Sequence, residues 1–303
     1  MKIILGINKI SKIYKPVLAL GVFDGLHRGH RQILQCVVRQ ACKIKGTSVA
    51  LTFWPHPQGE KSLYSLEHRL RLIAELGIEV CIVVNFNRNF AEISAHDFIA
   101  RILVKKIGVS FVYVGKNFRF GAKASGNYKL LAQSAKRNNF VLKVFKVVRF
   151  RGEELSSTAI RRLINQRKIK QAEKLLGRRV SVLGTVIEGS KLGRVLGFPT
   201  ANINPHHEIT PPAGVYAVQI NLLGKCYAGI CYIGSRPTFS AQNRSLHIEV
   251  HLFKFRGDIY GKSLEIQFVR FLRPDHKFAS IQELTGQIKK DILSCSTKFP
   301  TPR

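Results

Sequence analysis

The chain has 303 residues, with 49 Lys and Arg against 18 Asp and Glu, which gives a formal net charge of +31. Hydrophobic residues make up 45% and charged residues 22%, enough apolar material for buried cores, and this excludes an intrinsically disordered chain. No apolar run approaches the roughly 18 residues that cross a bilayer, and the opening segment has too short an apolar core for a secretory signal. We expect a two-domain protein of the cytoplasm.

The cysteines form no CxxC pair and have no zinc-finger spacing to histidine. The sequence therefore favours neither a metal centre built on thiolates nor a disulfide framework. We expect six reduced, mostly buried thiols: Cys36, Cys42, Cys81, Cys226, Cys231 and Cys295.

Positive charge is concentrated in the first part of the chain. Residues 98–152 contain thirteen Lys and Arg and no carboxylate. A field of this sign attracts polyanions such as nucleic acid, nucleotides or phosphorylated substrates. A basic, solvated surface without such a partner is the alternative interpretation, and charge by itself does not distinguish the two.

Short apolar runs alternate with helical patterns in the first half, which is typical of parallel strands joined by crossover helices. The expected strands are residues 17–23, 47–53, 80–86, 111–115 and 140–148. The expected helices are residues 31–44, 66–77, 94–108 and 128–138. The predicted fold class is α/β, with a doubly wound parallel-sheet (Rossmann-like) N-terminal domain.

From about Arg178 the pattern changes to short strand-like segments separated by Gly, Pro and Asn. The expected elements are strands at residues 179–187, 214–223, 226–234, 246–255 and 264–272, then a helix at residues 280–294. Strands without intervening helices indicate a small antiparallel barrel or sandwich, and we expect a barrel with a C-terminal helix. The predicted domains are residues 1–178 and 179–303.

Glycines and histidines gather where the first expected strand ends, in the run GVFDGLHRGH (21–30). In an open α/β sheet, ligands bind beyond the carboxyl ends of strands, where helix N-termini offer unpaired N–H groups. His27 and His30 are three residues apart, so they share one face of the first helical turn and both reach one phosphate group. Two histidines are usually structural, but a pair inside such a turn favours function.

This run resembles the HxGH signature of the nucleotidyltransferase superfamily. Three further runs occur in the order of the adenylyltransferase module of the bacterial bifunctional riboflavin kinase/FMN adenylyltransferase (FAD synthetase) family: TFWPHP (52–57), GKNFRFGAKASGN (115–127) and LSSTAIRRLI (155–164). The second half is similar to the riboflavin kinase module of that family in five runs: GTVIEGSKLGRVLGFPTANI (184–203), GVYAV (214–218), IGSRPTF (233–239), EVHLF (249–253) and YGKSLEIQF (260–268). The resemblance covers almost the whole chain.

The resemblance implies that the first domain joins FMN to the AMP part of ATP and releases pyrophosphate. The attacking FMN phosphate is already an anion, so the protein needs to position phosphates and offset their charge rather than supply a base. By resemblance His27, His30 and Arg161 are catalytic. By resemblance, further residues bind ATP: Gly21, Phe23, Asp24, Gly29, Asn117 and Ser157.

The SSTAIR run has a second interpretation that is independent of any ligand. Ser156 or Ser157 caps a helix that begins near Thr158, and Arg161 is then a solvated cation in its first turn. Capping and phosphate binding are compatible, and we expect both.

The resemblance implies that the second domain phosphorylates riboflavin, whose attacking group is a neutral alcohol that benefits from a general base. In LHIEVHLF the apolar residues alternate onto one face and leave His247, Glu249 and His251 on the other. Taken alone, Glu249 is a strand carboxylate facing solvent. By resemblance it is the catalytic base.

The PTAN run, residues 199–202, offers a hydroxyl and an amide oxygen, which are hard ligands suited to Mg²⁺. By resemblance Thr200 and Asn202 hold Mg²⁺ and Arg273 contacts the flavin. The alternatives are an ordinary turn after Gly197 and an exposed arginine at the end of a strand.

Two residues depart from the family pattern near the expected flavin contacts. Tyr232 stands where the family usually has asparagine, and Asp275 stands where glutamate is usual. The expected partners are the small-molecule substrates ATP, riboflavin and FMN, without a membrane or an obligatory nucleic acid. Two alternatives stay open: an adenylyltransferase with a degenerate kinase module, and a basic nucleic-acid-binding protein on this scaffold.

Overall fold

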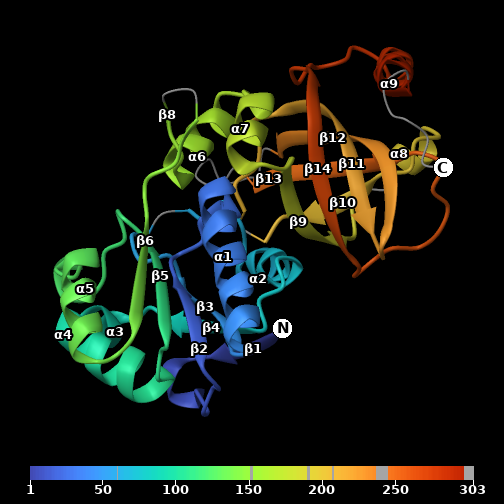
Figure 1. Ribbon diagram of the computed structural model, residues 1–303. Coiled ribbons are helices and arrows are strands. Elements are labelled where there is room, and N and C mark those ends of the chain that lie inside the picture. The colour runs from blue at the N-terminus through green and yellow to red at the C-terminus, as the bar shows by residue number, and fades with distance from the viewer. Residues whose placement is uncertain (60, 151–152, 190–191, 207, 237–244, 297–303) are drawn as a thin grey trace. The chain divides into compact units, whose positions relative to one another are not determined.

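The structure is a computed structural model that describes residues 1–59, 61–150, 153–189, 192–206, 208–236 and 245–296. The chain forms two compact units, Met1–Ser157 and Thr158–Arg303, each with its own core (Figure 1). Parts of two predicted motifs, residues 190–191 and 237–239, lie outside the described residues.

The first unit is built on a six-stranded sheet with the order β1-β4-β3-β2-β5-β6, and all its pairings are parallel. Its strands are β1 (Lys2–Leu5), β2 (Pro16–Leu20), β3 (Thr47–Trp54), β4 (Val80–Asn85), β5 (Phe111–Gly115) and β6 (Val141–Phe145). Strand β2 is buried along its whole length, as expected for the middle of a parallel sheet. Strand β1 was not predicted, because it is a mostly exposed edge strand without a buried apolar run.

Helices cover both faces of this sheet, as the doubly wound prediction requires. They are α1 (Arg28–Ile44), α2 (Leu66–Glu75), α3 (Arg88–Ala91), α4 (Ala95–Asp97), the π-helix η3 (Phe98–Ile107) and α5 (Tyr128–Arg137). Helices α1 and α2 share one core with the sheet, and η3 and α5 share the other. Short 3₁₀ turns and a two-stranded ribbon complete the unit: η1 (Ile7–Lys9), η2 (Asp24–Leu26), η4 (Ala122–Ala124), β7 (Arg149–Phe150) and β8 (Glu153–Glu154).

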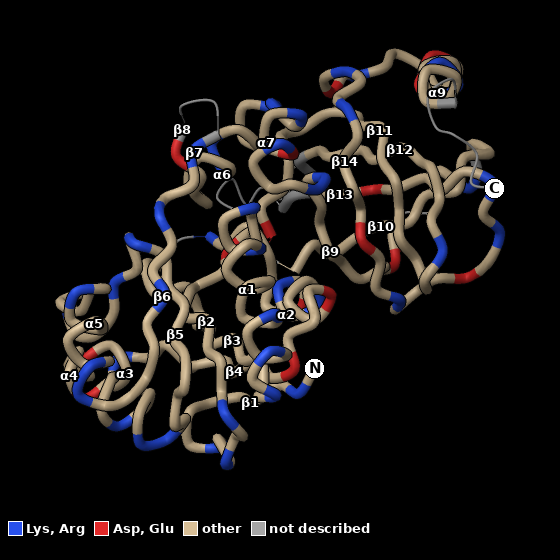
Figure 2. Tube along the Cα trace, in the orientation of Figure 1, with Lys and Arg blue, Asp and Glu red and all other residues tan. Residues whose placement is uncertain are grey.

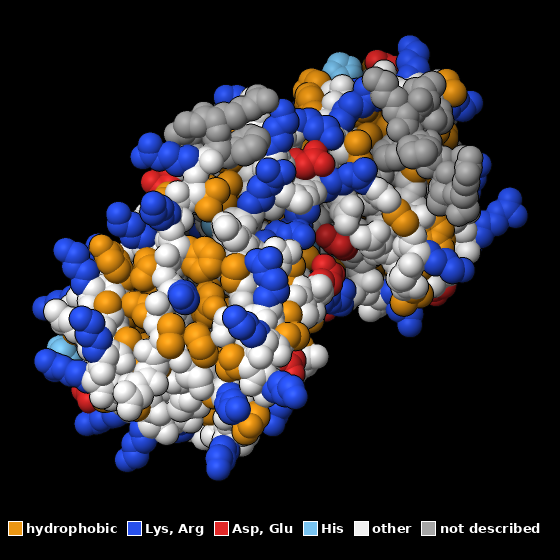
Figure 3. All heavy atoms as spheres, viewed as in Figure 1, with side chains coloured by type: hydrophobic (Ala, Val, Ile, Leu, Met, Phe, Trp, Pro, Cys, Tyr) orange, Lys and Arg blue, Asp and Glu red, His pale blue; other side chains and the backbone are white. Residues whose placement is uncertain are grey.

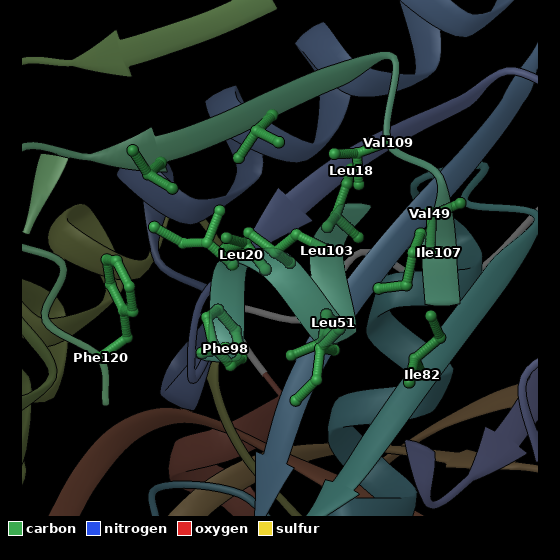
Figure 4. Packing of buried hydrophobic residues seen from close by; sticks show 14 of the residues in the cluster. Leu18, Leu20, Val49, Leu51, Ile82, Phe98, Leu103, Ile107, Val109 and Phe120 are labelled. Carbon is green, nitrogen blue, oxygen red and sulfur yellow. The ribbon is translucent and has the colours of Figure 1, made fainter. Parts of the chain in front are cut away.

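The segment predicted as one helix over residues 94–108 is a short α-helix followed by a π-helix, and it ends at Gly108. The buried residues of the π-helix are Phe98, Ile99, Ile102, Leu103 and Ile107. Figure 4 shows Phe98 and Leu103 within the cluster that packs against Leu18 and Leu51 of the sheet. The π-helix therefore contributes one apolar face to this core.

The second unit contains a closed antiparallel barrel with the strand order β10-β13-β12-β11-β14-β9. Its elements are α6 (Ser157–Asn165), α7 (Ile169–Leu176), β9 (Val180–Ile187), α8 (Leu192–Val195), β10 (Ala201–Asn204), β11 (Gly214–Leu222), β12 (Lys225–Arg236), β13 (Ser245–Leu252), β14 (Ser263–Arg273) and α9 (Ile281–Ser296). The predicted fold class, a Rossmann-like domain and a small barrel with a C-terminal helix, is confirmed. Strand β10 was missed because it is short and follows a turn-like run.

The boundary between the compact units falls directly after Ser157, the first residue of α6, whereas the sequence pattern changes at Arg178. Helix α7 packs against β9 and β14 and buries Ile169, Ala172, Leu175 and Leu176. The apolar face of α7 therefore ties residues 158–178 to the barrel. The apolar residues of α7 repeat with the same helical spacing as those of the first-half helices. For that reason the change from helical to strand-like sequence pattern comes after α7, at Arg178.

All six thiols are free, but only Cys81, Cys231 and Cys295 are buried, and Cys42 is exposed. The prediction of mostly buried thiols was wrong, because it judged α1 by composition and not by the face each residue occupies. No helix in the described part of the chain is long and apolar enough to cross a membrane.

The excess of Lys and Arg over Asp and Glu is visible along both units (Figure 2). On the face of the molecule seen in Figure 3, basic side chains project at many separate places, with hydrophobic and uncharged side chains between them. The charge is therefore spread over this face instead of forming one continuous basic patch.

Candidate functional site

The run GVFDGLHRGH forms the turn between β2 and α1, at the carboxyl end of a central strand. Three residues in it have left-handed backbone angles: Phe23 (φ 53°), Gly25 (φ 74°) and Leu26 (φ 38°). Non-glycine residues rarely adopt this conformation, so the turn is strained. Phe23 and Leu26 are nevertheless held there because both side chains are buried.

Two glycines of the turn occupy places where a Cβ would be tightly crowded by neighbouring side chains. A Cβ at Gly21 would lie 2.9 Å from the Phe23 ring. A Cβ at Gly29 would lie 3.3 Å from the His27 ring and 3.3 Å from Leu155. Gly21 and Gly29 thus let aromatic rings pack directly on the backbone of the turn.

The two histidines are brought together at the N-terminus of α1. His27 caps the helix, and its Nδ1 accepts a hydrogen bond from the His30 backbone N–H at 3.4 Å. The two rings stack with centroids 3.7 Å apart and planes 17° apart, and the edge of Phe23 meets His30 at 5.4 Å. The pair thus presents two imidazoles at the positive end of a helix dipole.

Both histidines are neutral at physiological pH. Burial lowers the pKa of His27 to about 4. Burial, together with the neighbouring His27 and Arg69, lowers the pKa of His30 well below its usual value. Nδ1 of His30 is buried and has no hydrogen-bond partner in the described part of the molecule. A neutral imidazole donates one N–H, so the pair can hydrogen-bond an anion without repelling its neighbour.

Asp24 links this turn to two distant segments. Its Oδ1 accepts the backbone N–H of Leu63 at 2.9 Å. Its carbonyl oxygen accepts the Ser157 hydroxyl at 2.9 Å. The side chain of Ser157, the first residue of α6, is therefore bonded to the turn and belongs with the histidines.

Two further residues were predicted for adenylyl transfer, Asn117 for ATP binding and Arg161 as a catalytic residue. Asn117 follows β5, the neighbour of β2, and so stands at the same edge of the sheet, where its Nδ2 donates to Glu154 Oε1 at 3.0 Å. Arg161 lies on α6 in the second unit, and its Nη1 donates to Thr158 Oγ1 at 3.4 Å.

Sequence reasoning missed Arg69, on the first turn of α2. Its side chain is fully buried, and Nη1 donates to the carbonyl oxygens of Val22 at 2.9 Å and Phe53 at 3.1 Å. Nη2 lies 3.7 Å from Asp24 Oδ1. The residue stands in the run LEHRLRL, whose mixed charges are typical of a solvated helix face, so the local pattern holds no signal for it.

A second group of polar residues gathers on the barrel, between β10 and β13. Asn202 and Glu249 are directly paired in the β10–β13 ladder. Thr200 Oγ1 donates to Glu249 Oε2 at 3.1 Å, and His247 Nε2 lies 2.5 Å from Glu249 Oε1. Each oxygen of the half-buried carboxylate therefore has one partner, which fixes its orientation.

The predicted alternation along β13 holds for the described side chains. Ile248, Val250 and Leu252 are buried, and Glu249 and its two neighbouring histidines are partly exposed. The side chain of Leu246 lies outside the described residues. The polar face of β13 is thus available to a ligand.

The PTAN residues have the features of a cation site. Oδ1 of Asn202 is buried and unpartnered among the described atoms, although buried acceptors are normally satisfied. A Cβ at Gly193 would lie 2.9 Å from Thr200 Oγ1, and a Cβ at Gly189 would overlap the Asn202 side chain. In the described residues no cluster of three or more His, Cys, Asp or Glu has a metal-binding arrangement. A hard cation bound by neutral oxygens fits these residues.

A cavity of about 490 Å³ opens beside Thr200. It is lined by Thr200 and, among others, by Val186, Arg194, Leu252, Phe255, Arg256, Asp258 and Tyr260. Its volume is within the range of small-molecule sites, and its two arginines suit phosphate groups. The segment after β13 was not predicted as part of a site, because it carries only an ordinary mixture of turn residues.

Arg273, the predicted flavin contact, is engaged by the C-terminal helix. Its Nη2 lies 2.9 Å and its Nε 3.0 Å from Asp291 Oδ2 on α9, and its guanidinium faces the Phe278 ring at 5.5 Å. This ion pair joins α9 to the last barrel strand. Arg273 is thus held in a fixed position instead of ending the strand in solvent.

Comparison with known proteins gives the same division of the chain. Residues 9–159 match the family model described as FAD synthetase, and residues 176–299 match that described as riboflavin kinase. The bifunctional riboflavin kinase/FMN adenylyltransferase of Escherichia coli strain K12 is 36% identical over 309 residues, covering 99% of this chain and 98% of that protein. The protein of the same description from Buchnera aphidicola subsp. Schizaphis graminum is 35% identical over 302 residues, covering 96% and 97%.

A solved structure has the same fold over nearly the whole chain. The crystal structure described as a macrolide-efflux protein from Streptococcus pneumoniae superposes with a TM-score of 0.87 at 26% identity, covering 99% of this chain and 100% of that one. The order of a parallel-sheet unit followed by a barrel is therefore found in an experimental structure as well.

Proposed function

Because the chain belongs to the bifunctional riboflavin kinase/FMN adenylyltransferase family, we propose that its two reactions take place at two separate sites, one in each unit. The chain is a riboflavin kinase and an FMN adenylyltransferase, since both family models match and relatives with both activities in their names align over nearly its full length. A single-function enzyme and a nucleic-acid-binding protein are not favoured.

We assign adenylyl transfer to the turn that carries His27 and His30. A phosphate oxygen of FMN attacks the α-phosphorus of ATP, and the bond from that phosphorus to the pyrophosphate oxygen breaks. The neutral imidazoles donate hydrogen bonds to the phosphates, and the N-terminus of α1 faces their negative charge. Ser157, whose hydroxyl is bonded to the turn, lies at the same site, and by resemblance to the family Arg161 is the catalytic cation of this reaction.

We assign the kinase reaction to Glu249. Its carboxylate accepts the proton of the riboflavin ribityl hydroxyl as that oxygen attacks the γ-phosphorus of ATP, and ADP leaves. The hydrogen bond from Thr200 and the contact with His247 hold the carboxylate in one orientation. The cavity beside Thr200 takes the nucleotide, and Arg273 borders the flavin.

We propose that Thr200 and Asn202 hold Mg²⁺ at the kinase site. When bound there, Mg²⁺ would supply positive charge that offsets the repulsion among the nucleotide phosphates. The unpartnered Oδ1 of Asn202, next to Glu249 in the sheet, is the observation that carries this assignment.

We propose that residues 1–178 carry the adenylyltransferase and residues 179–303 the kinase. The two family models support a division of this kind, because the FAD synthetase model ends at residue 159 and the riboflavin kinase model begins at residue 176. The free thiols are typical of a reducing compartment, so we propose the cytoplasm as its location. ATP, riboflavin and FMN are its partners, and neither nucleic acid nor a membrane is required.

One experiment tests both assignments. Pure protein is incubated with ATP, Mg²⁺ and either riboflavin or FMN, and the flavins are separated by liquid chromatography. Glu249→Gln should abolish FMN formation and leave the conversion of supplied FMN to FAD intact. His30→Ala should impair FAD formation by at least about tenfold and leave the kinase intact. Loss of both reactions in either variant would contradict separate sites.

A further inference from the structure

Arg69 is a fully buried cation in the first unit, and no surface function explains it. Placing a charge in a protein interior is costly unless its surroundings compensate. Burial lowers the pKa of the Arg69 guanidinium, and the Asp24 carboxylate opposes that effect. Because arginine stays protonated in proteins, this interior holds a permanent positive charge.

The guanidinium joins segments that are distant in the sequence. Nη1 donates to Val22 O in the strained turn and to Phe53 O at the end of β3. Nη2 lies 3.5 Å from Ser62 Oγ, in the segment that leads to α2. Thr52 Oγ1 donates to the same Val22 carbonyl at 2.7 Å. One planar group therefore binds the turn, the neighbouring strand and the following loop.

This geometry needs the shape of arginine. Guanidinium nitrogens donate in several directions from one rigid plane, whereas lysine offers a single, compact ammonium. A lysine at this position keeps the charge but does not reach both backbone carbonyls and the Asp24 side together. Because lysine keeps the charge of arginine but lacks its planar set of donors, substitutions at Arg69 can test the two properties separately.

We propose that Arg69 is a positioning residue for adenylyl transfer, which fixes the left-handed turn Phe23–Leu26 and thereby the stacked imidazoles of His27 and His30. The inference rests on the proposed assignment of those histidines to the adenylyltransferase site. Arg69 touches no substrate in this scheme. It acts by holding Val22 and Asp24, which immediately precede and follow Phe23, against the end of β3.

Two effects of Arg69 are separable. Its hydrogen bonds set the geometry of the turn, and its charge adds to the effects of burial and of the neighbouring His27 in lowering the pKa of His30. Among the described residues, the rings of His27 and Phe23 pack on the His30 ring, and the Arg69 charge influences it electrostatically. Arg69→Met removes both effects, and Arg69→Lys removes mainly the first.

The test is steady-state FMN adenylylation by the full-length protein. Arg69→Lys and Arg69→Met should lower kcat by about 10- to 100-fold, with the KM for ATP changed less than about threefold. Kinase activity should be unchanged. In Arg69→Met, the acid limb of the kcat/KM profile should also move to higher pH, and in Arg69→Lys it should not.

Arg71→Lys is the matched control, because Arg71 lies on the same helix, is half-exposed and pairs with Glu67 at 2.6 Å. It should leave both activities unchanged. Fluorescence of Trp54, the single tryptophan, reports melting of the first unit. Full activity in both Arg69 variants overturns the proposal. The proposal is also overturned if the loss of activity in the Arg69 variants is fully explained by a lowered melting temperature of the first unit.

Thr52→Val keeps the test decisive where an Arg69 variant does not fold. It removes one of the two donors to Val22 O and should lower kcat by about fivefold. An unchanged kcat counts against the proposal. FMN adenylylation by His30→Ala is measured in parallel. If His30→Ala is fully active, the assignment of the adenylyltransferase site is wrong. If His30→Ala is inactive while Arg69→Lys is active, only the proposed role of Arg69 is wrong.

Discussion

Tyr232 donates its phenol hydrogen to Asp275 Oδ2 at 3.2 Å, so the two residues that depart from the family pattern are bonded to each other. Tyr232 is paired with Glu249 in the β12–β13 ladder, and cross-strand partners face the same side of a sheet. Burial and the negative charge of Asp275 raise the pKa of Tyr232 to about 12, so the phenol remains a donor. Tyr232 and Asp275 thus form one hydrogen-bonded pair, and Tyr232 lies beside Glu249, the proposed base.

Tyr232→Phe should raise the KM for riboflavin by about fivefold and change the kinase kcat less, because the loss of one hydrogen bond frees the segment that follows Arg273, the proposed flavin contact. Asp275→Asn should have a similar effect. The double variant should be no worse than either single one, with a coupling of about 1 kcal/mol in a double-mutant cycle. Additive losses contradict the pairing. Tyr14→Phe, at an exposed tyrosine of the first unit, is the control.

The buried His27 should make the first unit sensitive to acid. Its folded pKa is about 4 against 6.5 in the unfolded chain, so the unfolded state takes up a proton first. The contribution to stability is complete above pH 6.5 and is lost as the pH falls from 6.5 to 4, up to about 3 kcal/mol. Urea unfolding followed by Trp54 fluorescence at pH 7 and pH 5 measures this loss. His27→Asn keeps a helix cap and should lose less stability over the same interval; an identical loss in both proteins is the contrary result.

Asn202→Ala should raise the Mg²⁺ concentration needed for half-maximal kinase activity by about 10-fold, because the variant lacks the unpartnered amide oxygen. The Mg²⁺ dependence of FAD formation from FMN should be unchanged. Asn204→Ala, two residues further along β10 and exposed, serves as the control. Equal Mg²⁺ requirements for the Asn202 and Asn204 variants would contradict the proposal that Asn202 holds Mg²⁺.

The barrel should need α6 and α7 for stability. A fragment of residues 158–303 keeps the helix that packs on β9 and β14, and a fragment of residues 179–303 exposes the apolar surface beneath Leu175 and Leu176. The shorter fragment should melt at a lower temperature by several degrees or aggregate, because burying each leucine contributes about 2 kcal/mol. Thermal melts and riboflavin kinase assays compare the two. Equal melting temperatures would show that α7 adds nothing to the barrel.

Residue pattern alone predicted the elements whose signal is local. The all-apolar run of β2, the three-four spacing of α1 and the alternation along β13 each repeat within a few residues, and each appears where it was expected. The motifs around His30, Thr200 and Glu249 identified the residues now proposed for chemistry. Edge strand β1 and short β10 lack such a repeat, and they were missed.

The sequence by itself determined the two fold classes, the order of the units and the family, because these depend on periodicity and on short motifs. Only the tertiary structure showed that Arg69 binds Val22, that Ser157 reaches Asp24 and that Tyr232 meets Asp275. Tyr232 and Asp275 are 43 residues apart in the sequence, Arg69 and Val22 are 47 apart, and Ser157 and Asp24 are 133 apart. A contact over such a distance leaves no local pattern, because it depends on how strands and turns are brought together in space.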